Sequence, residues 1–123
     1  MKDNRKPDPP TKFDWDAGGD RPIPGTEDWY LVTEVDDGGG YEWTTLRVYY
    51  SPSARRYFWH GDNGCSRNRW TDDVESAEDF GNGSRVDALN ALRRFAEYYS
   101  YSISGSGALD ASAGILTFKE PKP

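Results

Sequence analysis

The sequence predicts an α+β domain in which an antiparallel meander of three to four strands packs against one main α-helix. Aromatic and β-branched residues alternate with Gly- and Pro-containing turns between residues 29 and 64, as in short antiparallel strands. An apolar stripe with helical spacing follows Ser84. The length of 123 residues suits one domain. We expect a Pro-rich, flexible arm over 1–28, a globular domain over 29–119 and a tail over 120–123.

Three segments predict the strands of this meander. Residues 29–35 and 43–50 flank the loop 38–40, whose glycines permit the positive φ angles of a hairpin. Residues 57–60 form a third strand, which we expect to stop at 61–64 because that stretch has the composition of a turn.

The main helix is predicted over 85–99. Ser84 is a good N-cap, and Asp87 completes an imperfect capping box in the position where Glu or Gln is usual. Apolar side chains at spacings of three or four form the stripe that would cover the sheet: Val86, Leu89, Leu92, Ala96 and Tyr99. After the helix, 102–107 has loop composition and 115–118 is a candidate last strand.

Two segments outside these elements have more than one interpretation. The arm contains five prolines and only two large rings, Phe13 and Trp15, so it is either a solvated tail or a segment that these rings anchor on the domain or on a partner. Residues 72–80 place Val74, Ala77 and Phe80 inward from a short helical turn, with five carboxylates outward. Such a run is usually a solvated face; the alternatives are a cation site and a docking surface for a basic partner.

Composition narrows the class of protein. The net charge is -6, and residues 29–83 carry 10 acidic and 5 basic groups, so direct nucleic-acid binding is not expected. No stretch approaches the roughly 20 apolar residues of a membrane helix, and no apolar segment follows Met1. One cysteine cannot close an intramolecular disulfide. We therefore expect no membrane partner and a cytoplasmic location.

The residue types of a cysteine nucleophile occur together at the end of the third strand. Cys65, His60 and Asp62 would supply thiol, base and orienting carboxylate. Catalytic partners in cysteine hydrolases usually come from distant segments, so we interpret these residues as a structural turn and consider a Cys-dependent enzyme the less favoured class. Structural zinc normally takes four ligands dominated by Cys and His, and this chain has one of each, so we predict no metal. The glycines 38–40 lack the following Lys-Ser/Thr of a phosphate-binding loop, so we predict no cofactor.

A face of the predicted sheet is the candidate binding site. Leu46 and Val48 occupy the helix-covered face of their strand, which leaves its alternate residues on the opposite face. The hypothetical binding residues are Trp43, Tyr49, Tyr57, Trp59 and Arg47. Arg55, Arg56, Arg67 and Arg69 would form the rim. Such rings would make a stacking platform; the alternative is that they complete a small core or a protein interface.

Several short motifs resemble a family of small uncharacterised proteins encoded by actinobacteriophages. The motifs are Tyr41-Glu42-Trp43-Thr44-Thr45-Leu46, Tyr57-Phe58-Trp59 and Asp62-Asn63-Gly64-Cys65-Ser66. The resemblance covers about residues 29 to 95 and implies a phage origin. In that family a strand that ends in an aromatic pair runs into a Gly-Cys-Ser turn. Many relatives have a sequence similar to Cys-Ser-Cys in this turn, whereas this chain has Cys65-Ser66-Arg67, so a metal or redox role for the turn is not carried over.

The function that we predict is that of a non-enzymatic phage accessory protein, which binds a host or phage protein in the host cytoplasm. Exposed aromatic side chains would supply the contact. The alternative is an acidic mimic of nucleic acid that inhibits a DNA-binding host protein through the carboxylates of 72–79 and 34–42. The sequence leaves the partner and the oligomeric state open.

Overall fold

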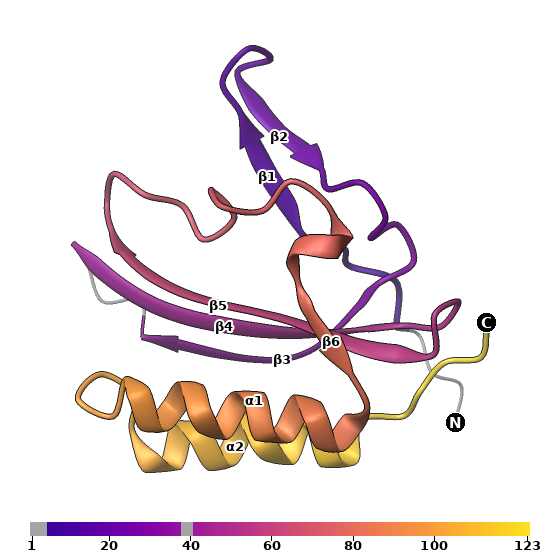
Figure 1. The fold of residues 1–123 in the computed structure, drawn as a ribbon, viewed down its shortest axis with the longest axis vertical. Helices are drawn as coiled ribbons and strands as arrows, with labels where there is room; N and C mark the ends of the chain where they lie inside the picture. The colour runs from indigo at the N-terminus through magenta and orange to yellow at the C-terminus, as the bar shows by residue number, and fades with distance from the viewer. Residues whose placement is uncertain (1–4, 38–40) are drawn as a thin grey trace.

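The computed structural model describes residues 5–37 and 41–123 and has an α+β fold (Figure 1). The strands are β1 (Thr11–Asp14), β2 (Gly19–Pro22), β3 (Tyr30–Asp37), β4 (Glu42–Ser51), β5 (Arg56–Cys65) and β6 (Gly81–Gly83). The helices are the 3₁₀ turn η1 (Ala77–Asp79) and the α-helices α1 (Arg85–Tyr98) and α2 (Gly105–Thr117). β1 and β2 form a hairpin of their own, and the other four strands form one antiparallel sheet.

The four-stranded sheet has the order β3-β4-β5-β6, so the predicted meander is present with β6 as a fourth strand. The predicted stop of the third strand at 61–64 is wrong, because β5 stays paired with β4 as far as the pair Glu42 and Cys65. The glycines of this stretch leave room for rings. A Cβ on Gly61 would lie 2.5 Å from the Phe95 ring, and one on Gly64 would lie 2.7 Å from the Trp43 ring. The predicted loop 38–40 lies outside the described residues.

The main helix is confirmed, with its capping box. Ser84 Oγ accepts a hydrogen bond from the Asp87 amide at 3.2 Å, and the Asp87 carboxylate accepts one from the Ser84 amide at 3.0 Å. Most of the predicted stripe faces the core as expected: Leu92 is buried, and Leu89, Ala96 and Tyr99 pack against the same core. Val86 is the exception, since it is 63% exposed, while Ala88 is buried in addition. The buried face includes Ala88 because α1 packs against a second helix as well as against the sheet.

That second helix corrects the prediction of one main helix. α2 takes up residues 105–107 of the predicted loop and 115–117 of the predicted strand, whereas 102–104 are outside regular structure as predicted. Ser104 is its N-cap and accepts a hydrogen bond from the Gly107 amide at 3.0 Å. Three glycines and three serines lower the helix propensity of 104–114, which hid the apolar positions Ala111 and Ile115.

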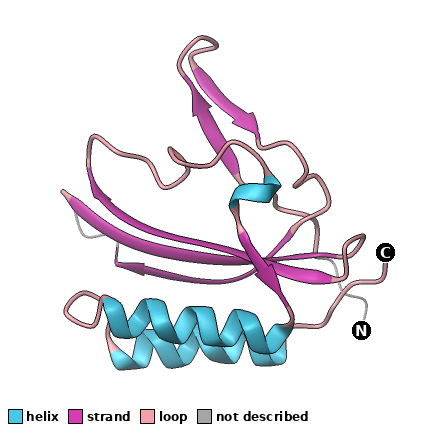
Figure 2. Ribbon diagram, viewed as in Figure 1, coloured by secondary structure: helices cyan, strands magenta, loops and turns pink. Residues whose placement is uncertain are grey.

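Both helices lie against one face of the sheet (Figure 2). The side chains buried between the helices and this face of the sheet include Leu46, Val48, Leu92 and Ile115. We call this cluster the helix-side core.

The opposite face is covered by loop segments and the short η1 turn instead of α-helices (Figure 1). Its buried side chains are Ile23, Trp29, Tyr49, Val74 and Phe80, which we call the arm-side core. Val74 and Phe80 thus point inward as predicted, and η1 is the expected helical turn. The arm packs on the domain at Ile23, which is 0% exposed. Of the two rings predicted as possible anchors, Trp15 is 78% exposed and Phe13 contacts Arg69.

Candidate functional site

The predicted aromatic platform is not one surface. Tyr49 is 3% exposed in the arm-side core, and Tyr57 is 2% exposed in the helix-side core. Trp59 packs against the helix-side core. The common exposed face that the sequence predicted for these rings is therefore wrong, because Tyr57 and Trp59 alternate onto the side of the sheet that the helices cover.

Trp43 and Arg47 lie on the arm side of the sheet, and neither is free. Trp43 Nε1 donates hydrogen bonds to the carbonyl oxygens of Cys65 at 2.9 Å and Asn68 at 3.2 Å. Arg47 pairs with Glu34, and its guanidinium carbon lies 4.9 Å from the centre of the Trp70 ring. Both side chains fasten the strands and loops around them.

Residues 8–11 of the arm close over this part of the sheet. Together with Leu31, Glu34, Arg47 and Tyr49 they line a cavity of about 320 Å³. Burial raises the pKa of Tyr49 to about 12, although the charge of Arg47 and a hydrogen bond with it act in the opposite direction. The Tyr49 hydroxyl therefore stays protonated at neutral pH.

The residues of the candidate cysteine chemistry are separated. His60 and Cys65 are five positions apart in the uninterrupted β4–β5 ladder, so their side chains leave opposite faces of β5. His60 Nε2 lies 2.9 Å from the Trp70 carbonyl oxygen, and Cys65 Sγ donates to Asn68 Oδ1 at 3.4 Å. Each side chain thus contacts the loop that follows β5. Across residues 5–37 and 41–123, no group of three or more His, Cys, Asp or Glu side chains is placed to hold a metal ion.

One of the exposed large rings lies on the β1–β2 hairpin; Tyr41, Tyr98 and Tyr101 are others. Trp15 is 78% exposed beyond the end of β1. The Phe13 ring meets it edge-on, with 4.7 Å between the ring centres. Arg69, from the loop after β5, places its guanidinium carbon 4.3 Å from the centre of Phe13 and 5.8 Å from that of Trp15. We call Phe13, Trp15 and Arg69 the hairpin surface.

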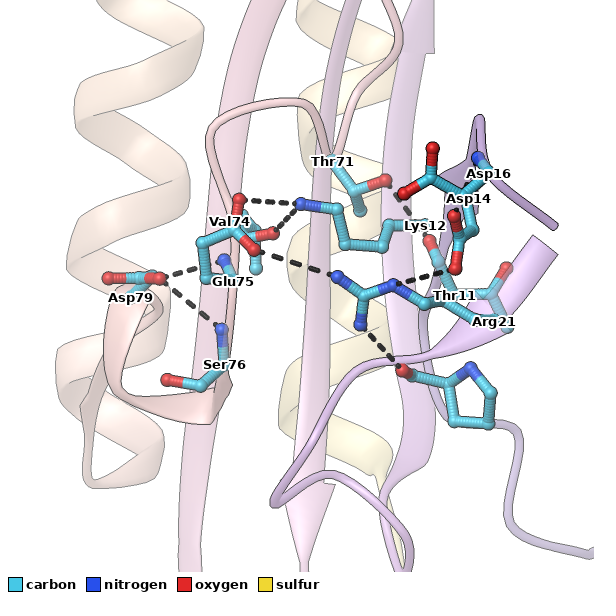
Figure 3. Close-up of polar contacts among 11 residues, drawn as sticks. Thr11, Lys12, Asp14, Asp16, Arg21, Thr71, Val74, Glu75, Ser76 and Asp79 are labelled. Atoms are coloured by element: carbon cyan, nitrogen blue, oxygen red, sulfur yellow. Dashed lines mark hydrogen bonds and ion pairs between the residues drawn. The ribbon is translucent and has the colours of Figure 1, made fainter.

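Polar contacts hold this hairpin to the segment before η1 (Figure 3). Lys12 Nζ donates to the Val74 carbonyl oxygen at 2.6 Å and to the Glu75 carboxylate at 2.9 Å. Thr71 Oγ1 donates to the Thr11 carbonyl oxygen at 3.1 Å. Arg21 lies between two carboxylates, with nitrogen to oxygen distances of 3.8 Å to Asp14 and 3.6 Å to Glu75. The β1–β2 hairpin that carries Phe13 and Trp15 is therefore fixed against the segment before η1.

The carboxylates of 72–79 also form contacts within the chain near this hairpin. An Asp72 oxygen accepts a hydrogen bond from the Arg69 amide at 2.9 Å, and an Asp79 oxygen accepts one from the Glu75 amide at 2.8 Å. Glu75 is paired with Lys12. Asp72, Glu75 and Asp79 thus have partners within the chain, although all five acidic residues of 72–79 are exposed.

The model of the family described as "Domain of unknown function (DUF7574)" matches residues 26–110, more than half of the chain. The chain belongs to the DUF7574 family. The DUF7574 segment includes the four-stranded sheet and α1, whereas the β1–β2 hairpin precedes it. This match is consistent with a resemblance to an uncharacterised family, and its description mentions neither a phage origin nor the Gly-Cys-Ser turn. No curated protein and no solved structure matches the chain.

Among the residues that the structure describes, none of the helices is both long and apolar enough to span a membrane.

Sequence reasoning missed the hairpin that precedes the DUF7574 segment, although a local signal was present. Asp14 Oδ1 accepts hydrogen bonds from the amides of Asp16 at 2.9 Å and Ala17 at 3.2 Å, and Gly18 has a φ of 71°. Asp and Gly at this spacing are typical of a tight turn. Arg69, by contrast, lies more than fifty residues away, and no local pattern could bring it to Phe13.

Proposed function

We propose that this protein is a non-enzymatic binding module whose hairpin surface engages another protein. The observation that carries the proposal is the 78% exposed Trp15, on a hairpin fastened to the domain. Phe13 of the hairpin and Arg69 of the loop after β5 lie beside its ring. Trp, Tyr and Arg dominate the binding energy of many interfaces. A ring held before binding loses little conformational freedom on contact.

The surroundings of Trp15 indicate the chemistry of the partner. Asp16 and Asp20 are exposed on the same hairpin, and the chain has a net charge of -6. A phosphate backbone would be repelled. A protein that offers an apolar pocket with basic side chains at its rim fits this surface.

The resemblance of residues 29 to 95 to actinobacteriophage proteins supports the cellular context of the proposal. In this context the protein is a phage accessory protein, and the partner is a host or phage protein in the cytoplasm of the host cell. The side chains of His60 and Cys65 on opposite faces of β5 support binding over cysteine catalysis.

Affinity capture from host lysate with three forms of the protein tests this function. The forms are the natural chain, Trp15→Ala and the control Tyr98→Ala, which truncates a 76% exposed ring on α1 far along the chain from the hairpin. We expect a partner that the natural chain and Tyr98→Ala capture equally and that Trp15→Ala captures at least about tenfold less. Equal capture by all three forms would contradict the proposal.

Salt separates this proposal from the acidic mimic of nucleic acid. A contact made by Trp15 buries apolar area and should persist at high salt. A contact made by the carboxylates of 72–79 and 34–42 should dissociate as salt rises, because charges are screened over about 10 Å at 0.1 M ionic strength. A salt-sensitive complex that ignores Trp15→Ala would favour the mimic.

A further inference from the structure

We infer that the outer edge of β3, with the groove between β3 and α2, binds an extended peptide segment that carries basic side chains and pairs with β3 as an additional strand. This site lies on another part of the molecule from the hairpin surface. It therefore stands independently of the proposed function.

Among the described residues, the outer edge of β3 is open. β3 ends the strand order β3-β4-β5-β6, and in this part of the chain its one paired neighbour is β4. Alternate residues of such a strand direct their N–H and C=O groups away from the sheet. Within the described ranges, the backbone bond beside this strand is from the Asp8 amide to the Trp29 carbonyl oxygen, just before β3 begins, and residues 33–37 receive none on the outer side. Unpaired backbone groups are the template for strand addition.

A groove runs beside this open edge. A cavity of about 610 Å³ is lined by residues 33–37 on one side and by Ser102, Ile103 and the first half of α2 on the other. Near Thr33, α2 approaches closely, since a Cβ on Gly114 would lie 2.8 Å from Thr33 Oγ1. The groove therefore closes at Thr33 and lies open along 35–37. An edge strand facing a helix across a groove gives an added strand both backbone partners and side-chain contacts.

The floor and the rim of the groove differ in polarity. Val35, Ile103 and Ala111 are buried along it and offer an apolar floor. Asp37 and Asp110 are exposed at its rim. Because side chains alternate along a strand, a bound strand would direct every second residue over this floor and the others away from it.

The charge of the rim decides the occupant. Glu34 and Asp36 leave the opposite face of β3 and are held by Arg47 and Thr45 of β4. Asp37 and Asp110 have no ion pair or side-chain hydrogen bond to any residue that the structure describes. The described residues that line the groove include no Lys, Arg or His. An extended segment in which Lys or Arg alternates with small apolar residues complements this groove.

Three labelled nine-residue peptides test the site by fluorescence anisotropy on the full chain. One alternates Lys and Val, one alternates Glu and Val, and the third is the Lys and Val peptide with its central Val replaced by proline. We expect the first to bind at least tenfold more tightly than the other two. The Glu peptide reverses the charge, and proline removes a ladder donor while keeping the charge. Equal binding of the first and third peptides would overturn strand pairing.

Protein variants locate the contact. The double variant Asp37→Asn/Asp110→Asn should weaken binding of the Lys and Val peptide at least fivefold, whereas the control Asp16→Asn/Asp20→Asn should bind as the natural chain does. Trp15→Ala should also bind normally, so failure of the hairpin proposal and failure of this one are distinguishable. Equal loss in both double variants would show a general charge effect and overturn the site.

Amide hydrogen exchange detects the added strand directly. With the peptide bound, alternate amides within 33–37 should exchange at least tenfold more slowly. The comparison edge is that of β5 beyond Trp59, where pairing with β6 ends, and its amides at 61–65 should be unchanged. Binding without protection of β3, or protection of the β5 edge alone, would contradict the inference.

Discussion

The two faces of the four-stranded sheet are closed in different ways. On the helix side, α1 and α2 are neighbours in the sequence and bury mainly aliphatic side chains such as Leu92 and Ile115. On the arm side, the segment before β3 and the segment after β5 pack aromatic side chains against one another and against the sheet. Trp29 stacks on Phe58 with 4.3 Å between ring centres and meets Phe80 edge-on at 4.8 Å.

This difference shows how a sheet face can be covered without α-helices. Large rings bury much area per residue, so a few of them close a face that irregular segments cover. Irregular backbone also needs polar partners, which Lys12, Asp72 and Asp79 supply to nearby carbonyl and amide groups. Within the described ranges, no buried side-chain nitrogen or oxygen is left without a hydrogen bond. The arm-side core thus depends on contacts between distant segments.

The largest expected effect comes from truncating one core residue on each face. Trp29→Ala should lower the free energy of unfolding by about 3 to 5 kcal/mol and Leu92→Ala by about 2 to 5 kcal/mol, since both side chains are almost fully buried. Urea denaturation followed by circular dichroism and by Trp fluorescence measures both. We expect the two signals to coincide in each variant, because β4 and β5 supply side chains to both cores. Separate transitions would show that the arm side unfolds alone.

A smaller effect should follow from releasing the hairpin. Lys12→Met keeps the aliphatic stem but removes the bonds to Val74 and Glu75, and we expect a loss of about 1 to 3 kcal/mol in urea denaturation. The control is Arg93→Met on α1, which removes an exposed pair with Glu97 at 4.0 Å and should cost less than about 0.5 kcal/mol. Similar losses in both variants would mean that the hairpin is not held by Lys12.

The two capping boxes compare the faces at a finer level. Ser84→Ala removes the N-cap of the 14-residue α1 and should cost about 1 kcal/mol. Ser76→Ala removes the cap of the three-residue η1 on the arm side and should cost about 0.5 kcal/mol, because fewer backbone bonds depend on it. Thermal denaturation of both variants checks the order. A larger loss for Ser76→Ala would show that η1 organises the arm side more strongly than its length indicates.

The smallest expected effect is the loss of stability at acidic pH that follows from Asp28, whose carboxylate is bonded to the turn between β4 and β5. Burial acts to raise the pKa of Asp28, but hydrogen bonds from Ser53 and Ser51 outweigh it and lower the pKa below its usual value. A lowered pKa means that folding favours the ionised form. This contribution is therefore present at neutral pH and is lost as pH falls below about 4 through the lowered pKa.

Urea denaturation at pH 7, 5 and 3 checks this sign. Asp28→Asn should be less stable than the natural chain at pH 7, and the difference should shrink at pH 3. The control Asp73→Asn, at an exposed carboxylate, should show no comparable change between these pH values. A constant difference for Asp28→Asn would show that the carboxylate acts through its shape and not its charge.

Local patterns determined much of the fold. Alternation and turn residues predicted β3, β4 and the start of β5, and Ser84 with Asp87 predicted where α1 begins, because a period and a cap depend only on neighbouring residues. The inward positions Val74 and Phe80 were found in the same way. In each case the physical cause lies within a few residues of its effect.

Only the tertiary structure decided which side chains are exposed and where the candidate sites lie. The Ser- and Gly-rich α2 has weak helix propensity and is stabilised by packing Ala111 and Ile115 against β3 and α1. Tyr49 lies on the face that alternation predicted, yet the distant segments of Ile23 and Phe80 cover it. Burial depends on contacts between residues far apart in the sequence, and these contacts form only when the whole chain folds.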